Sequence, residues 1–153
     1  MAYKTKDYTI LSKCNTRRNP VMNQEERLEY VKFRIESAYQ TYNAAKSLFE
    51  NEFWNSSVNR LYYAVFYAVN ALLVLNKIKT KTHSSVKSQF SLHFIKTERL
   101  DKKYGQLLNI LFDMRQKGDY ENMYNYDEES VEPLIEKVGK MLQVIEYEIK
   151  NTL

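Results

Sequence analysis

The stretch LYYAVFYAVNALLVL, residues 61–75, decides the fold. Its apolar residues recur at helical spacing, and one asparagine and several tyrosines interrupt them. With the residues from Trp54 before it and Asn76 after it, the stretch predicts a helix that is apolar on nearly all sides, which is typical of the central helix of a bundle. The main stripe consists of Val58, Leu61, Val65, Val69 and Leu72, and it is widened by Tyr62, Phe66 and Leu73.

Amphipathic helices are predicted on both sides of this segment. Upstream, apolar residues recur in alternating steps of three and four from Leu28 to Phe49, which indicates one long helix. Asn23 is suited to cap its N-terminus, and the motif ENEF, residues 50–53, ends it. Downstream, Thr82 is suited to cap a third helix. The apolar face of that helix consists of Val86, Phe90 and Phe94.

Two further helices are predicted in the C-terminal half. One begins near Asp101 and stops near Gly118, because glycine favours the C-terminal end of a helix. The last one takes Ser130 as its N-cap, which places Pro133 in the first turn, where a missing N–H costs little. The apolar positions of this last helix are Val131, Leu134, Val138, Leu142, Ile145 and Ile149.

The fold class predicted from these segments is all-α. No segment alternates as a strand does, and the 153 residues contain only 3 Gly and 2 Pro, too few for a turn-rich sandwich or barrel. The length suits one domain. We therefore expect an antiparallel, up-and-down bundle of about five helices over residues 23–153, preceded by a disordered basic arm over residues 1–22.

The net charge of +4 comes from that arm. Residues 1–20 contain five basic residues and one acidic residue, and the remaining 133 residues are neutral overall. The arm has two open interpretations: an extension upstream of a start at Met22, or a tail that touches nucleic acid. Within the body, residues 77–103 carry a net charge of +6 and residues 119–148 carry −7. These two segments either form a partner surface or pair with each other.

Several classes of protein lack support in the sequence. There is no signal-peptide core and no window of about 20 apolar residues, so we expect a cytoplasmic protein without a membrane span. One cysteine allows no internal disulfide. His83 and His93 are ten residues apart and no metal-binding, P-loop or dinucleotide-binding motif occurs, so we expect no metal and no cofactor.

Three polar residues stand out beside the apolar stripes. Arg60 precedes the central run, His83 opens the third helix and Arg115 follows the stripe of the fourth. Taken singly, each has an ordinary role: an arginine that extends to solvent, a histidine at a helix end and an arginine that favours its own helix C-terminus.

Together, however, these residues belong to a set of motifs. The stretch from Trp54 to Tyr120 resembles the HEPN superfamily, in particular its small single-domain prokaryotic branch. The matching motifs are NRLYYAVFYAVNALL, then KTHSSV and FIKT, then MRQKGDY, in this order and spacing. The resemblance implies an antiparallel helical bundle that is often dimeric. It also implies a role in toxin–antitoxin or defence systems, and a small nucleotidyltransferase as a common partner.

Many members of that superfamily are metal-independent ribonucleases. The resemblance implies a catalytic arginine, four to six intervening residues and then a histidine, with two such motifs meeting across the dimer. Arg115 matches the arginine, but Tyr120 stands where the histidine is expected and no histidine follows Arg115. RNA cleavage through the 2′-hydroxyl needs a group that moves a proton near neutral pH. Histidine, with a pKa of about 6.5, suits this role better than tyrosine, near 10.

The sequence therefore retains a phosphate-binding half and lacks the usual proton-transfer half. Our first hypothesis is a binding module that engages a nucleotide, RNA or a nucleotidyltransferase. Its candidate ligand residues are Arg115, Arg60, His83 and Asp119. The alternatives are a ribonuclease toxin that uses Arg115 with Tyr120 or His83, and a purely structural helical module.

The tyrosines also have both a structural and a functional interpretation. Tyr62, Tyr63 and Tyr67 are expected to pack in the bundle or at a dimer face, with their hydroxyl groups reaching a partner. Three more, Tyr120, Tyr124 and Tyr126, are expected in a loop beside Arg115. They either cover the open end of the bundle or stack on bases.

Overall fold

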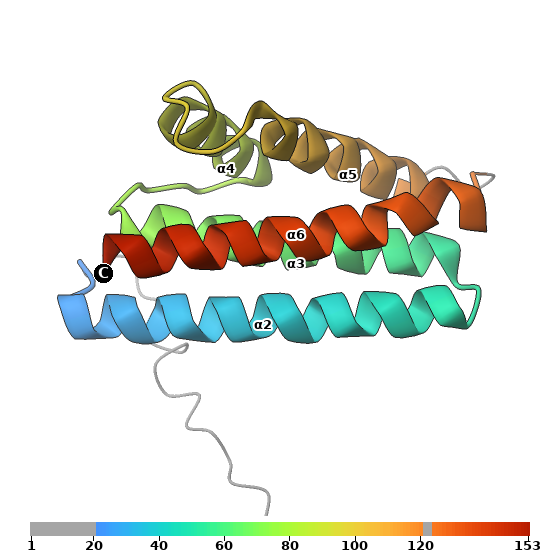
Figure 1. Ribbon diagram of the computed structural model, residues 1–153, viewed down its shortest axis with the longest axis horizontal. Coiled ribbons are helices and arrows are strands. Elements are labelled where there is room, and N and C mark those ends of the chain that lie inside the picture. Colours follow the sequence, from blue (N-terminus) through green and yellow to red (C-terminus); the bar gives the residue numbers. More distant parts are fainter. Residues whose placement is uncertain (1–20, 121–123) are drawn as a thin grey trace, which may run out of the picture.

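The computed structural model describes residues 21–120 and 124–153 (Figure 1). The predicted disordered arm, except for its last two residues, lies outside these ranges. The described part contains no strand and five α-helices: α2 (Gln24–Glu50), α3 (Trp54–Leu75), α4 (His83–Phe90), α5 (Lys102–Tyr120) and α6 (Glu128–Thr152). A π-helical turn, η2 (Ser91–Ile95), continues α4. The all-α prediction is confirmed.

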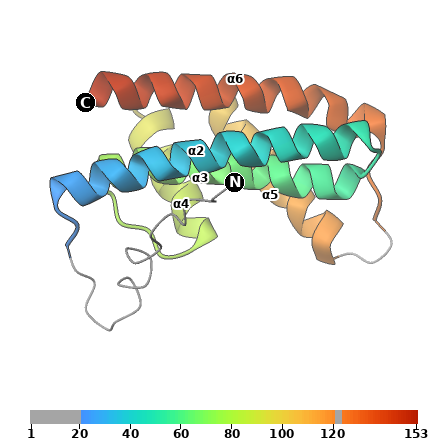
Figure 2. The same cartoon turned by 90° about the horizontal axis from the view of Figure 1, so that it is seen from below.

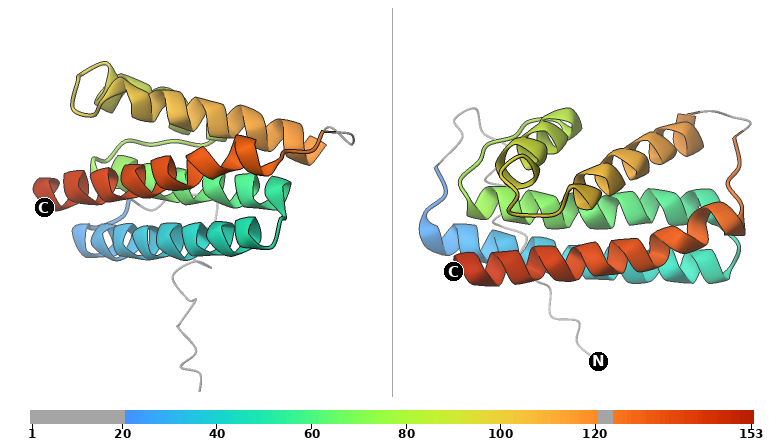
Figure 3. Two further views of the ribbon diagram at one scale, coloured as in Figure 1. Left: turned by 45° about the vertical axis from the view of Figure 1, so that its right-hand side comes forward. Right: turned by 45° about the horizontal axis from the view of Figure 1, so that its top comes forward.

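Helices α2 and α5 run in one direction, and α3 and α6 run in the other (Figure 1). Helix α4 lies in the connection between α3 and α5, and α4 and α5 together cover one side of α3 (Figure 3). The side-by-side helices α3 and α6 are therefore parallel neighbours, whereas α2 and α3, joined by a short loop, are antiparallel as expected (Figure 2).

Helix α3 is the centre of the bundle, as the sequence predicts. It packs against α2, α4, α5 and α6. Half of its 22 residues are buried, from Ser57 to Leu73. The single buried polar side chain among these, Ser57, donates its hydroxyl to the Ala45 carbonyl of α2 at 2.8 Å. The fold thus depends on the stretch that is most apolar in the sequence.

By length and composition alone, α3 is also the one described helix that could cross a membrane. The central helix of a bundle in water passes the same test. Here 56% of the apolar window is buried inside the protein, so packing against the other helices accounts for its apolar character.

Two predicted caps are confirmed. The Asn23 side chain accepts the Glu26 N–H at 2.9 Å, and the Glu26 carboxylate accepts the Asn23 N–H at 3.1 Å. Thr82 and Ser85 form the same reciprocal arrangement at the start of α4. Each pair satisfies two backbone donors that have no partner inside the helix, which fixes where α2 and α4 begin.

The start of α6 differs from the prediction. Asp127, rather than Ser130, is the N-cap, and its carboxylate accepts both the backbone N–H (2.9 Å) and the hydroxyl (2.6 Å) of Ser130. Pro133 consequently lies inside the helix. The Glu129 carbonyl loses its usual donor, but Glu129 is exposed, so water can bond to it. A charged oxygen that takes two donors from one residue outweighs the preferred position of proline.

The end of α5 also differs. The helix continues past Gly118 to Tyr120. Glycine inside a helix costs only about 1 kcal/mol relative to alanine, so Gly118 does not force a stop. Tyr120 is therefore a helical residue and not a loop residue.

Gly139 and Gly118 provide a matched pair of stability tests. A Cβ atom at Gly139 would lie 2.6 Å from Tyr42 Oη, which donates to the Ile135 carbonyl, and 3.2 Å from Tyr42 Cζ. We expect Gly139→Ala to lower the free energy of unfolding by about 1–3 kcal/mol through overpacking. At Gly118 the nearest atom lies 3.4 Å away. Gly118→Ala should be neutral or stabilising by up to about 1 kcal/mol. Urea unfolding measures both, and equal effects would contradict this packing.

Candidate functional site

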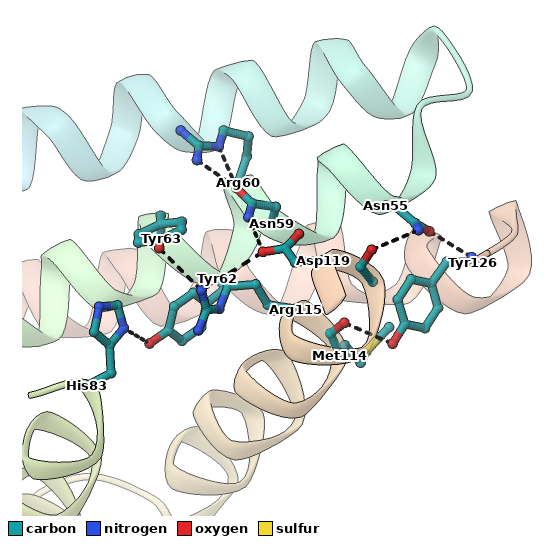
Figure 4. Close-up of polar contacts among 11 residues, drawn as sticks. Asn55, Asn59, Arg60, Tyr62, Tyr63, His83, Met114, Arg115, Asp119 and Tyr126 are labelled. Atoms are coloured by element: carbon teal, nitrogen blue, oxygen red, sulfur yellow. Dashed lines mark hydrogen bonds and ion pairs between the residues drawn. The ribbon is translucent and has the colours of Figure 1, made fainter. Parts of the chain in front are cut away.

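The four predicted ligand residues come from three helices and form one polar cluster (Figure 4). Arg60 lies on α3, His83 begins α4, and Arg115 and Asp119 lie one turn apart on α5. Side chains of α3 connect them to one another: Asn59, Tyr62 and Tyr63.

Helical spacing explains how α3 presents these connecting side chains. Asn59, Tyr62, Tyr63 and Phe66 occupy positions i, i+3, i+4 and i+7 and therefore share one face. That face meets α4 and α5. The central helix thus supplies an aromatic surface on which the charged residues of neighbouring helices pack.

Arg115 is a largely enclosed charge, with a side chain only 10% exposed. Its guanidinium carbon lies 4.8 Å from the ring centroid of Tyr62, 5.6 Å from that of Tyr63 and 5.8 Å from that of Phe112. Its Nη1 donates to Tyr63 Oη at 3.3 Å, whereas its buried Nε has no hydrogen-bond partner. A buried donor without a partner is uncommon, and it leaves Arg115 with unused capacity for an acceptor.

One carboxylate, that of Asp119, faces Arg115 directly and is connected to Arg60 only through Asn59. Asp119 Oδ2 lies 3.9 Å from Arg115 Nη1 and accepts a hydrogen bond from Asn59 Nδ2 at 2.9 Å. The carbonyl oxygen of the same Asn59 side chain accepts from Arg60 Nε at 3.0 Å and Nη2 at 2.6 Å. Since Arg60 has no carboxylate within 4.0 Å among the described residues, the cluster has an excess of positive charge.

His83 joins the cluster through Tyr62. The Tyr62 hydroxyl and His83 Nδ1 lie 2.6 Å apart, and the imidazole stacks on Phe66 with ring centroids 4.4 Å apart. Burial raises the pKa of Tyr62 to about 12, so its hydroxyl keeps its proton at neutral pH. Burial, and then the positive charge of Arg115, lower the pKa of His83 below its usual 6.5. His83 is therefore neutral at pH 7.

These two shifts leave both groups neutral, and the tautomer of His83 then sets the direction of their hydrogen bond. In one of the two tautomers the Tyr62 hydroxyl donates to an unprotonated Nδ1, and in the other it accepts from Nδ1–H. In the first tautomer the proton of His83 resides on Nε2, which makes this nitrogen a donor. In this state His83 can hydrogen-bond to an anion through Nε2, but it cannot remove a proton at that atom.

Tyr120 lies apart from the cluster. It follows Arg115 by five residues, which turns it about 140° around the helix axis. Its side chain is 74% exposed and lines a shallow groove with Asp113, Gln116 and Lys117. The structure brings His83, and not Tyr120, close to Arg115.

Tyr126 covers the end of the bundle, which was one of the two predicted roles. It is 8% exposed, and its hydroxyl donates to the Met114 carbonyl at 3.0 Å. Asn55 of α3 holds this segment by accepting the Tyr126 N–H and donating to the Tyr124 carbonyl, both at 2.8 Å. Tyr124 is exposed and packs edge-on against Tyr126.

An open groove of about 740 Å³ borders one side of the cluster, and neither Arg115 nor His83 lines it. Arg60, Asn59 and Asp119 form part of its wall, and Asn55 and Ser56 extend it toward the start of α3. Small-molecule sites commonly have volumes of about 300–1,000 Å³, and the volume of this groove lies within that range.

Within residues 21–120 and 124–153, no three His, Cys, Asp or Glu side chains lie close enough together to hold a metal ion. The donors of the cluster are guanidinium, amide, hydroxyl and imidazole groups, which are suited to an anion.

Comparison with known proteins identifies the family. The family model that describes the HEPN domain matches residues 31–148 of this sequence, which is more than three quarters of the chain. The chain belongs to the HEPN family.

Several curated relatives are similar over most of their length. A UPF0332 protein of Thermotoga maritima is 37% identical over 85% of this chain and 97% of its own. Two proteins of Methanocaldococcus jannaschii bear the names "Putative toxin MJ0142" and "Putative toxin MJ0605". The first is 37% identical over 67% of this chain and 70% of its own, and the second is 30% identical over 82% and 97%.

Sequence reasoning missed the residues that connect the cluster. Asn59 joins Arg60 to Asp119, Tyr62 joins His83 to Arg115, and Asn55 holds the segment after α5. The i, i+3, i+4, i+7 pattern that begins at Asn59 could have identified the first two. Asn55 offers no such signal, because its partners are backbone groups about 70 residues away.

The pKa of His83 provides a test of the cluster. We expect its NMR titration midpoint to lie below 6.5 and to rise in Arg115→Gln, because the variant removes a nearby positive charge. The control Arg99→Gln should leave the midpoint unchanged, since Arg99 pairs with Glu148 elsewhere. Because folding lowers this pKa, its contribution to stability is present above 6.5 and is lost as the pH falls through the folded value. A midpoint at or above 6.5 would contradict the burial of His83.

Proposed function

We propose that this HEPN protein is the nucleotide- or RNA-binding member of a toxin–antitoxin or defence system, and that it holds a phosphate group at the Arg115 cluster. The observation that carries the proposal is the buried guanidinium of Arg115, whose Nε lacks a partner and whose neighbouring carboxylate is shared. The toxin association is supported by the printed names of the two archaeal relatives.

Each member of the cluster has a role in this proposal. Arg115 supplies charge and two adjacent N–H groups, a geometry that matches a phosphate. Arg60 adds a second guanidinium at the wall of the groove. His83, with its proton on Nε2, donates one more hydrogen bond. Asp119 does not bind the phosphate but orients Arg115 in its absence.

A second candidate function is metal-independent RNA cleavage. It is favoured by one observation: Arg115 and His83, from two helices, both contact Tyr62. In the tautomer with its proton on Nε2, His83 does not serve as the general base, which needs an unprotonated nitrogen facing the 2′-hydroxyl. Cleavage would require the Tyr62 hydroxyl to leave Nδ1, or the imidazole to turn.

We also propose two binding partners for this chain. The family resemblance supports a homodimer and a small nucleotidyltransferase that acts with this chain. The acidic segment that begins at Asp119 and the basic segment from Lys77 to Lys103 provide surfaces of opposite charge for such contacts.

Binding of a ribonucleoside 5′-monophosphate, measured by calorimetry in EDTA, tests the proposed function. We expect Arg115→Gln to weaken binding about 10-fold or more, because charge-assisted hydrogen bonds contribute about 1.5–3 kcal/mol. Asp119→Asn should strengthen it a few-fold, because the carboxylate competes with phosphate for the same guanidinium. Arg99→Gln is the matched control and should bind as wild type does.

The same samples decide between binding and cleavage. Incubation with RNA in EDTA should leave the RNA intact. Robust cleavage that is lost in both Arg115→Gln and His83→Ala would replace the binding proposal with the ribonuclease. Wild type and Arg115→Gln could bind the nucleotide with equal affinity while circular dichroism shows that both are folded. That result would contradict both the binding proposal and the ribonuclease alternative.

A further inference from the structure

A second arginine–tyrosine cluster lies beyond the candidate site, at the contact of α2 with α3. The guanidinium carbon of Arg34 lies 5.1 Å from the ring centroids of both Tyr30 and Tyr67. Its Nε donates to Tyr30 Oη at 2.9 Å, and the Tyr30 hydroxyl donates to Asn70 Oδ1 at 2.9 Å. These contacts hold the guanidinium group of Arg34 beside two aromatic rings.

This second cluster is continuous with the first. Arg60, Tyr63 and Tyr67 occupy positions i, i+3 and i+7 of α3 and therefore lie on one face. The guanidinium carbon of Arg60 lies 5.1 Å from the Tyr63 centroid, and the Tyr63 and Tyr67 centroids are 5.9 Å apart. Arg60, Tyr63, Tyr67 and Arg34 thus form a line, which we call the α3 track. Its ends on α3, Arg60 and Tyr67, are about 10 Å apart at 1.5 Å per residue.

Within the part of the chain that the structure describes, no ion pair neutralises the arginines of the track. Among the described residues, no carboxylate lies within 4.0 Å of Arg34 or Arg60. All four side chains of the track are partly exposed. Arg99 illustrates the contrast: it also packs over a ring, that of Phe94 at 4.6 Å, but it is neutralised by Glu148.

This combination fits one class of ligand. Aromatic rings and guanidinium planes stack on unpaired bases, and the positive charges attract the phosphates between them. A duplex hides its base faces and offers this surface only its backbone. We propose that the α3 track binds single-stranded RNA that continues from the phosphate held at Arg115. This inference rests on the proposed function and extends it to a ligand class and to two further residues, Arg34 and Tyr67.

The alternative occupant of the track is a second copy of this chain. In a two-fold dimer contact the same surface of each copy takes part. The contact would therefore bring together the guanidinium groups of both copies, which have no carboxylate partner among the described residues. Like charges in an interface are unfavourable. The charge of the track therefore favours a polyanion over a second copy.

Fluorescence anisotropy with a labelled 12-nucleotide single-stranded RNA, in EDTA, tests the track. We expect at least 10-fold tighter binding of the single strand than of the same sequence as a duplex. Arg34→Gln should weaken single-strand binding at least five-fold and reduce the salt slope by about 0.7, the loss of one phosphate contact. Arg34→Lys should keep the salt slope but still lose affinity, because lysine has no planar group to stack. Arg99→Gln should change nothing.

The binding of the mononucleotide separates failure of the track from failure of the proposed function. If Arg34→Gln binds the 12-mer as wild type does, while the mononucleotide still depends on Arg115, the track alone is overturned. If neither ligand binds to wild type, both proposals are overturned. If Arg34→Gln leaves RNA affinity unchanged and converts a dimer to a monomer by sedimentation, a second copy covers the track and the inference is overturned.

Discussion

The arrangement of the site depends on the burial of one guanidinium group. A charge that is removed from water is costly unless other groups compensate it. Arg115 is compensated by three aromatic rings, one hydroxyl group and a carboxylate at 3.9 Å. Cation–π contacts contribute about 0.5–2 kcal/mol each, with the larger values where water is excluded. The requirement for these rings explains why the central helix of the bundle, which could be purely aliphatic, carries tyrosines on the face toward α4 and α5.

The fold could largely be predicted from the sequence because its signals are local. The stripes of the helices and the caps at Asn23 and Thr82 depend on residues within one or two turns. The errors arose where two local preferences compete. At the start of α6, the carboxylate of Asp127 prevails over the preferred position of Pro133, and in α5 the continuing helix tolerates Gly118.

The site was harder to predict because its geometry is not local. Arg60, His83, Arg115 and Asp119 were identified by their motifs. Helical spacing places Tyr62 on the same face of α3 as Asn59, but it does not show that Tyr62 joins His83 to Arg115 across 21 and 53 residues. Tyr120 follows Arg115 by five residues, which suggested that the two form a catalytic pair. On a continuous helix, however, this spacing points the two side chains in different directions. The functional difference between an anion site and a nuclease then depends on which nitrogen of His83 carries the proton, and no residue pattern in the sequence determines this.

Arg115 Nε is the atom that tests this account most directly. Its ¹H–¹⁵N NMR signal can be followed in EDTA while a ribonucleoside 5′-monophosphate is added. The account predicts a saturable downfield shift with the same midpoint as calorimetry, because the unpartnered N–H gains an acceptor. A signal that stays unchanged while the nucleotide binds would show that Arg115 only packs in the bundle, and it would contradict the central claim.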